Sequence, residues 1–423
     1  MREDFIHYLW KHKKFETKDL STTEGKPIVI VSTGLHNQDA GPDFFNSKIR
    51  INDQLWAGNI EIHLKSSDWF AHSHEKDKAY DNVILHVVWE HNMAIFRRDN
   101  SEIDTLELKQ FVSKEALNNY HKLFSKGQKW INCENEFGDV DEFLLSNWLE
   151  RLYFERLERK SDEINLMLEK SKNDWEAVLF KMLAKNFGLK VNGESFLSIA
   201  NSIDFSLLRK EGTSILKMES LLFGQAGLLD GDKEDVYFRE LKASYAYQRH
   251  KYRLKNQSVT SLQFFRLRPP NFPTIRLSQL ANLYQSKSNL FAEILDANSV
   301  KKIYEILSIS SSPYWETHYT FDKTSKKSKK KITNSFMDLM LINSIIPLKF
   351  SYSKYVGKSM DSEIIQWMTD LRSEKNSLVE KFHTVKPLPN NAMNSQALIQ
   401  LKTNYCDKNN CLQCAIGNDL LSW

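Results

Sequence analysis

Hydrophobic and polar residues alternate along about the first 110 positions as β-strands require. Successive side chains of a strand point to opposite faces of a sheet, so period-two alternation or a short continuous apolar run predicts a strand. A helix is predicted before them, at 4–14, and Asn52-Asp53 predicts the tight turn of a hairpin. Strands are expected at 27–33, 44–51, 54–64, 83–89 and 105–108.

After about residue 140 the apolar residues recur at helical spacing. Asp141 is suited to cap a long amphipathic helix, because its carboxylate can accept hydrogen bonds from the free N–H groups of a first turn. Asp174 is expected to cap a second helix, which Gly188 would end. No fixed-period repeat of the sequence indicates a solenoid. Further helices are expected at 214–223, 234–254, 274–286, 334–345, 359–381 and 394–404.

These patterns predict two domains. Residues 1–135 should form an α/β domain with one helix and a mixed sheet, and residues 136–423 a mostly α-helical domain with the C-terminal cysteines. The formal charge of +4 is too small to indicate nucleic acid by itself. No apolar run approaches the roughly eighteen residues of a membrane span, and acids near the start argue against a signal peptide. We therefore expect a cytoplasmic protein without membrane contact, and its oligomeric state stays open.

Acidic and basic residues form a row on two neighbouring predicted strands. Asp43 comes just before one strand, and Glu61, His63 and Lys65 share one face of the next. Two carboxylates from adjacent strands, with a basic side chain nearby, are what a hard divalent cation and a hydrolytic water need. The alternative is an ordinary turn aspartate beside a solvated glutamate on the open face of an antiparallel sheet.

The Gly-Pro-Asp motif that ends at Asp43, the predicted hairpin, and the Glu-Ile-His motif from Glu61 to His63 resemble the signature of the PD-(D/E)XK nuclease superfamily. Its fold is restriction-endonuclease-like. The resemblance implies that Asp43 and Glu61 bind Mg²⁺ or Mn²⁺. His63 stands where the superfamily has a lysine, so His63 or Lys65 would orient or deprotonate the attacking water.

Two further points follow from resemblance alone. Some members of the superfamily use a glutamate of the first helix as a metal ligand, and Glu3 is the matching residue here. The whole chain also resembles a bacterial family of conserved proteins with no established function. That second likeness implies no chemistry.

Residues after the second motif are rich in groups that bind ions or phosphates. Eight of the twelve histidines lie in the first 91 positions. If 74–80 forms a short helix, His74, Asp77 and Tyr80 lie close together and, with His72, would support the site. His86, in an apolar strand, is expected to be a core histidine with a hydrogen-bond partner. Alternatively, Asp77 and the histidines, including His63, would form a zinc, iron or manganese site.

Three of the four cysteines are grouped near the C-terminus as Cys406-x₄-Cys411-x₂-Cys414, and the fourth is Cys133. In a reducing compartment they are thiols or metal ligands. If Cys133 meets the other three, zinc or an iron–sulfur cluster would link distant parts of the chain. Some PD-(D/E)XK nucleases of the RecB type are similar in having one distant and three grouped cysteines around a cluster. The alternative is four reduced cysteines in a helical hairpin.

A basic, proline-rich segment favours a nucleic-acid partner. Arg266, Arg268 and Arg276 surround Phe272, whose ring could stack on a base or hold two helices together. The candidate metal site and this basic segment together predict magnesium-dependent hydrolysis of phosphodiester bonds in DNA or RNA. The alternative is a catalytically inactive, nuclease-like module that binds nucleic acid or protein, because a histidine replaces the lysine.

Overall fold

The computed structural model of the chain describes residues 1–37, 39–125, 129–374 and 376–421. They form two compact units. Unit 1 contains Met1–Trp148 and the segment from Leu401 onward, and unit 2 contains Leu149–Gln400. An α/β region followed by a mostly helical region confirms the predicted fold class. Unit 1 differs from the predicted domain 1–135 in two ways. It extends to Trp148, and it includes the C-terminal segment, which was expected to belong to the helical domain.

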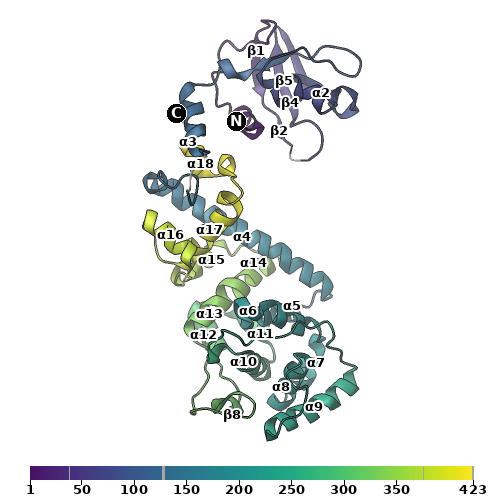
Figure 1. Cartoon of the computed structure of the whole chain (residues 1–423), viewed down its shortest axis with the longest axis vertical. Helices are drawn as coiled ribbons and strands as arrows, with labels where there is room; N and C mark the ends of the chain where they lie inside the picture. Colours follow the sequence, from purple (N-terminus) through teal and green to yellow (C-terminus); the bar gives the residue numbers. More distant parts are fainter. Residues whose placement is uncertain (38, 126–128, 375, 422–423) are drawn as a thin grey trace. The chain divides into compact units, whose positions relative to one another are not determined.

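A mixed sheet forms the centre of unit 1 (Figure 1). Neighbouring strands lie in the order β1, β3, β4, β5, β6, and β2 pairs with β3. The pairs β1/β3 and β3/β4 are antiparallel, whereas β4/β5 and β5/β6 are parallel. The strands are β1 (Ile28–Ser32), β2 (Leu35–His36), β3 (Phe44–Ile51), β4 (Gln54–Lys65), β5 (Val83–Glu90) and β6 (Thr105–Glu107).

The predicted hairpin at Asn52-Asp53 joins β3 to β4. Ile51 pairs with Gln54, so the two residues between them make the turn. Asn52 has a φ of 52°, a left-handed conformation that asparagine adopts more readily than most residues. The turn sets the register of β3 on β4 as far as Ser47 opposite Gly58, and an irregularity between Ser47 and Phe44 then shifts it by one residue, so that Phe44 lies opposite Ile60.

Residues of β4 alternate between two faces of the sheet. Ile60 and Ile62 belong to the main core of unit 1, which also includes Phe5 and Leu9 of α1 (Glu3–His12). α3 (Lys114–Leu123), η9 (Cys411–Gln413) and α18 (Ala415–Leu420) also contribute to this core. The opposite face carries a smaller cluster around Trp69 and Tyr80. Glu61 and His63 are buried on that second side of the strand.

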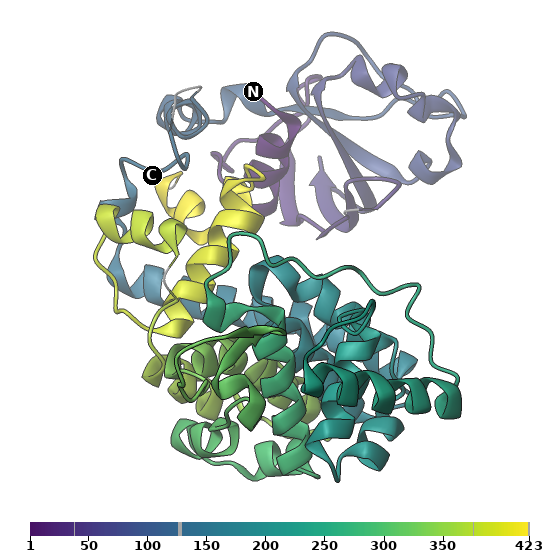
Figure 2. The same cartoon turned by 60° about the horizontal axis from the view of Figure 1, so that its bottom comes forward.

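Helices pack against one another in unit 2 (Figure 2). A small hairpin of β7 (His318–Thr320) and β8 (Lys323–Thr324) accompanies them. Helix α4 (Glu142–Lys170) begins in unit 1 and continues into unit 2. The α-helices that follow it in unit 2 are α5 (Trp175–Phe187), α6 (Leu189–Asn201), α7 (Phe205–Glu211), α8 (Ile215–Gln225), α9 (Val236–Tyr252), α10 (Pro273–Ser286), α11 (Leu290–Asp296), α12 (Val300–Leu307), α13 (Asn334–Met340), α14 (Ile346–Tyr355), α15 (Asp361–Asp370), α16 (Ser377–Val385) and α17 (Ala392–Gln400).

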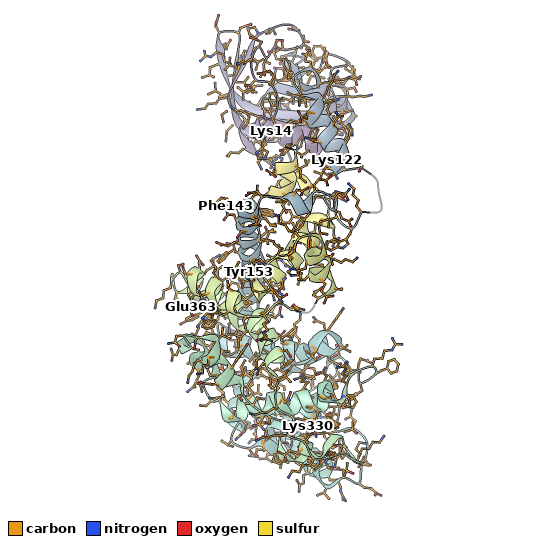
Figure 3. The ribbon with its side chains drawn as sticks, turned by 90° about the vertical axis from the view of Figure 1, so that its left-hand side faces the viewer. Lys14, Lys122, Phe143, Tyr153, Lys330 and Glu363 are labelled. Atoms are coloured by element: carbon orange, nitrogen blue, oxygen red, sulfur yellow. The ribbon has the colours of Figure 1, made fainter. Side chains whose placement is uncertain are left out.

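The caps predicted for the first two long helices are present. The Leu144 N–H donates to the Asp141 carboxylate at 2.9 Å, and the Ala177 N–H donates to Asp174 at 3.1 Å. Helix α4 is amphipathic, with Tyr153 buried and Phe143 exposed (Figure 3). The prediction of one helix over 359–381 is wrong. α15 ends at Asp370 because Leu371 turns into extended backbone, where its carbonyl accepts from the Ala392 N–H.

Within the described ranges, no helix combines the length and the apolar character needed to cross a membrane.

Gly58 permits a close approach of β4 to the start of β5. A Cβ at this position would lie 2.4 Å from Cγ2 of Ile84 and 2.6 Å from the Asn82 carbonyl oxygen. We expect Gly58→Ala to lower the free energy of unfolding of unit 1 by about 1–3 kcal/mol, the usual effect of overpacking. Urea-dependent hydrogen exchange of the β4 and β5 amides measures this change.

The matched control is Ala57→Val, which adds carbon atoms at the exposed neighbouring position of the same strand. We expect it to change the stability by less than about 0.5 kcal/mol. Equal stabilities of the two variants would contradict a steric limit at Gly58.

Candidate functional site

Two reciprocal hydrogen bonds join Asp43 to Glu61 and to the next residue, Ile62. The Asp43 backbone N–H donates to Oε2 of Glu61 at 3.2 Å, and the Ile62 backbone N–H donates to Oδ2 of Asp43 at 2.9 Å. The register places Phe44, which follows Asp43, opposite Ile60, which precedes Glu61. The antiparallel pairing of β3 and β4 therefore brings the two predicted acidic residues together.

Glu61 is held where its charge is poorly solvated. Its side chain is 6 % exposed. Burial, and next the nearby charge of Asp43, raise the pKa of Glu61 to about 9. A carboxylate in this position favours either a proton or a cation that replaces the lost water. The site thus has the electrostatic character expected for a cation-binding position.

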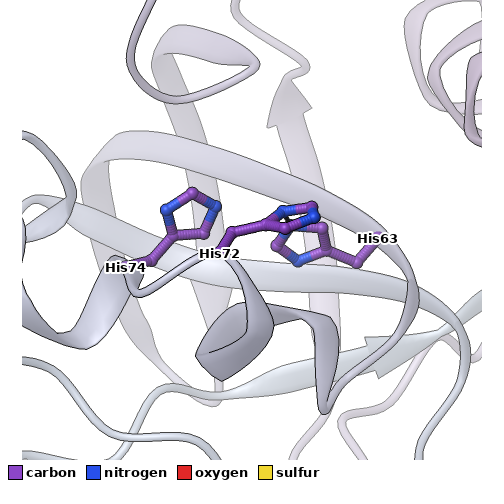
Figure 4. A group of neighbouring side chains, drawn as sticks. All are labelled: His63, His72 and His74. Carbon is purple, nitrogen blue, oxygen red and sulfur yellow. Dashed lines mark hydrogen bonds between the residues drawn. The ribbon is translucent and has the colours of Figure 1, made fainter.

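Two histidines lie beside the Glu61 carboxylate, and a third lies next to one of them. His63 follows on β4, His72 caps the C-terminus of α2 (Asp68–Ala71), and His74 begins η1 (His74–Lys76). Oε1 of Glu61 lies 3.3 Å from Nε2 of His74 and 3.6 Å from Nε2 of His63. The same His63 nitrogen lies 3.1 Å from Nδ1 of His72. One ring nitrogen of each histidine lies within 4.8 Å of the others (Figure 4).

These separations match those of ligands around one ion. Four ligand atoms about 2.1 Å from a tetrahedral metal ion lie about 3.4 Å from one another. The three distances of 3.1, 3.3 and 3.6 Å agree with that geometry. Nε2 of His74 is also buried without a hydrogen-bond partner, although it faces the Glu61 carboxylate. The three histidines therefore form a group that could hold a metal ion, and Glu61 lies beside two of them.

The orientation of His63 is fixed by His86 on the neighbouring parallel strand. Nδ1 of His63 lies 2.8 Å from Nε2 of His86, which is fully buried. Burial, followed by the nearby histidines, lowers the pKa of His63 to about 3 and that of His86 well below its ordinary value. Both rings are therefore neutral. A proton on Nδ1 of His63 would be donated to His86 and would leave the lone pair of Nε2 facing Glu61.

His74 is held by aromatic contacts. Its ring stacks on Tyr80 with a centroid separation of 3.8 Å and meets the edge of Trp69 at 5.4 Å. Tyr80 ends η2 (Lys78–Tyr80), whose N-terminus is capped by the Asp77 side chain through the Ala79 N–H. The predicted short helix over 74–80 is thus two 3₁₀ turns. Tyr80 and Asp77 shape the loop that carries His74.

Helix α1 adds two residues on the Asp43 side. Nε2 of His7 lies 3.4 Å from Oδ2 of Asp43. Burial lowers the pKa of His7, but the hydrogen bond and charge of Asp43 outweigh it, so the net shift is upward. Burial raises the pKa of Glu3, and Asp43 contributes to the same shift. Sequence reasoning named Glu3 and missed His7, although the spacing of four residues places both on one face of a helix.

Lys65 and the basic segment of unit 2 lie in different surroundings. Lys65 is exposed at the end of β4, and its backbone N–H donates to Asp68. Arg266 and Arg268 are also exposed. Phe272 packs edge-to-face on Phe264, which lies in a loop rather than in a second helix.

Arg276 is enclosed by its own unit. Its side chain is buried and donates to Gln279 and Asn271 at 3.0 and 2.7 Å. The guanidinium also lies over the Phe336 ring at 3.8 Å. Burial lowers the pKa of Arg276 to about 10. The guanidinium of Arg276 therefore contacts protein groups rather than solvent.

The four cysteines lie together in unit 1, although Cys133 is far from the other three in sequence. Cys133, Cys406, Cys411 and Cys414 line the same small cavity. All four are thiols without disulfides. The possibility that Cys133 meets the C-terminal group, which the sequence left open, is realised in the structure.

Comparisons with known proteins give one match. No curated protein and no solved structure matches the chain. A family model described as "Protein of unknown function (DUF2851)" matches residues 3–377, which is most of the chain. The chain therefore belongs to this family of proteins of unknown function, DUF2851.

Proposed function

We propose that unit 1 is a metal-dependent phosphodiesterase that hydrolyses nucleic acid, with Asp43 and Glu61 as metal ligands. The hydrogen bond from the Asp43 N–H to Glu61 and the one from the Ile62 N–H to Asp43 carry the proposal. Together they keep two carboxylates adjacent in a poorly solvated place. A metal ion held by two carboxylates can polarise a phosphoryl oxygen and so activate the phosphodiester for attack.

The order of elements supports the PD-(D/E)XK resemblance on which this proposal draws. Glu3 lies on α1, Asp43 directly precedes β3, and Glu61 and His63 lie on β4. The antiparallel hairpin of β3 and β4 is followed by the parallel strand β5. This is the sequence of helix, hairpin and further strand that the resemblance implies.

The ligand set favours Mn²⁺ over Mg²⁺. Mg²⁺ prefers oxygen ligands and keeps several waters, whereas first-row transition ions also accept imidazole nitrogen. The neutral ring of His63, together with His72 and His74, offers such nitrogens near Glu61. The same residues would hold zinc or iron in the alternative of a histidine-metal site. We place Mn²⁺ first because it suits both the carboxylates and the imidazoles.

The side chains around the ion would divide the work of hydrolysis. A bound cation would polarise a phosphoryl oxygen and make its water more acidic. The low pKa of about 3 makes the His63 ring a poor general base, which favours a role as ligand or as hydrogen-bond acceptor. His7 sits on the other carboxylate with a raised pKa and can hold a proton beside Asp43 near neutral pH.

A basic hollow in unit 2 supports nucleic acid as the substrate class. The exposed side chains of Arg249, His250, Arg253 and Lys255 line a cavity of about 680 Å³ at the C-terminal end of α9. Asp230 is also part of its lining. Clustered Arg and Lys side chains attract phosphate backbones with an affinity that falls as salt increases.

Manganese binding provides the first test. We expect Mn²⁺ to raise the melting temperature of the metal-depleted protein by several degrees, because an ion bound only to the folded state adds about 2.7 kcal/mol at 100 times its Kd. Glu61→Gln should remove most of this shift. Without metal it should fold at least as well as wild type, since burial already favours a neutral group there. Differential scanning calorimetry measures both effects.

The control for this test is Asp53→Asn, which makes the same kind of change at the exposed turn of the hairpin. It should keep the full Mn²⁺ shift. An equal shift in wild type, Glu61→Gln and Asp53→Asn would exclude Glu61 as a ligand.

Cleavage provides the second test. Wild type should cut single- or double-stranded DNA or RNA with Mn²⁺ or Mg²⁺, whereas Asp43→Asn and Glu61→Gln should lower the rate by more than about 100-fold. Gel assays of labelled oligonucleotides measure the rate, with Asp53→Asn as the active control. Cleavage that survives in both site variants would refute the proposal. Binding without cleavage by wild type would instead favour the inactive, nuclease-like module.

The residue at the lysine position gives a third test. If His63 is a ligand, both His63→Ala and His63→Lys should weaken the Mn²⁺ shift, even though the second substitution restores the residue of the superfamily. Calorimetry and the cleavage assay are run on the same preparations. A His63→Lys protein that keeps both the shift and the activity would show that the side chain orients water instead.

A further inference from the structure

A second group of potential ligands lies in unit 1, with residues different from those around Asp43. The four cysteines of the sequence line one cavity there. From their convergence we infer that Cys133, Cys406, Cys411 and Cys414 form a thiolate-bound metal centre that holds zinc or an iron–sulfur cluster. Four cysteine thiolates are the usual ligand set of both. This inference does not depend on the proposed nuclease activity.

Burial and proximity distinguish these thiols from isolated cysteines. Cys411 and Cys414 are 9 % and 7 % exposed. Burial raises the pKa of Cys133 to about 12, and Cys414 and Cys411 add to that shift. The same two causes, burial and the other three sulfurs, raise the pKa of Cys406. The sulfur of Cys406 therefore lies near the sulfurs of the other three cysteines.

Hydrogen-bond donors are directed at the sulfurs. The Asn132 side-chain amide donates to Sγ of Cys411 at 3.3 Å. The backbone N–H groups of Ile416 and Gly417 donate to Cys414 and lower its pKa against the effect of burial. Donors of this kind stabilise thiolates and tune metal–sulfur centres.

The C-terminal ligand loop is tightly built. The Cys414 N–H donates to the Cys411 carbonyl at 3.2 Å, which closes a turn between the two cysteines. A Cβ on Gly417 would lie 2.0 Å from that same carbonyl oxygen, so only glycine fits. Cys406 ends η8 (Leu401–Cys406), a π-helical turn of a type that is frequent at functional sites.

The centre would connect the two parts of the chain that make unit 1. Cys133 lies in a turn tied to α3 by the ion pair of Lys122 and Glu136 at 3.0 Å (Lys122 is labelled in Figure 3). The segment from Leu401 packs η9 against α1 and α18 against α3. Four metal–sulfur bonds would hold this segment in place against α1 and α3.

Metal analysis of the full-length protein, purified without oxygen or chelator, is the direct test. We expect about one zinc per chain, or iron with acid-labile sulfide and absorbance near 400 nm, as the two forms of the centre require. A zinc result identifies a single ion and an iron–sulfide result identifies a cluster. Native protein with neither, in which all four thiols react at once with a thiol reagent, would overturn the inference.

Variants separate this centre from the histidine site. Cys414→Ser should lose the zinc or iron, whereas Glu61→Gln should keep it. Asn132→Ala, which removes a donor to Cys411, should lose the metal to a chelator about 10 to 100 times faster. Gln413→Ala, an exposed residue of the same turn, is the matched control and should behave as wild type.

Protection of thiols in the wild-type protein gives a readout that needs no variant. The four thiols should react slowly with a thiol reagent and become reactive when a chelator removes the metal. Metal content unchanged in Cys414→Ser, or thiol reactivity unaffected by chelator, would overturn the inference. An inactive enzyme in the cleavage assay would leave these results unchanged, so the two proposals can fail separately.

Discussion

The two hydrogen bonds that join Asp43 to the Glu61 side chain and to the Ile62 backbone N–H are the constraint on which the candidate site depends. They form where β3 begins and the main pairing of β3 with β4 ends, next to an irregular register between Phe44 and Ser47. A regular antiparallel pair would continue its ladder past this point. Here the ladder is replaced by carboxylate acceptors, so the backbone itself holds two acidic groups in one low-dielectric place.

The pKa shifts of Glu61 and of two neighbouring histidines favour their neutral forms. Burial shifts Glu61 toward its protonated form and His63 and His86 toward their unprotonated forms. Glu61, His63 and His86 therefore do not form an ordinary buried salt bridge, which is stabilised by fixed opposite charges. Perturbed pKa values of this kind cluster at functional sites, which makes these three residues candidates for one.

The sequence predicted those features that depend on local pattern. Alternation located β3, β4 and β5, and Asp141 and Asp174 cap helices as expected because capping involves residues three positions apart. Asp43 and Glu61 could be placed near one another in advance because a two-residue turn sets the register of the hairpin, although the one-residue shift between Ser47 and Phe44 was not predicted. The fold class followed from the same evidence.

Features that depend on distant contacts could not be predicted from local pattern. The approach of His7 to Asp43 depends on how α1 packs on the sheet, and the burial of Arg276 depends on Phe336 of another helix. The break after Asp370 arises from pairing with residues near Asn391. Unit 1 itself is assembled from both ends of the polypeptide, with unit 2 inserted between them. During translation the inserted residues leave the ribosome before the C-terminal elements of unit 1, so the helical unit can fold before unit 1 has all of its elements.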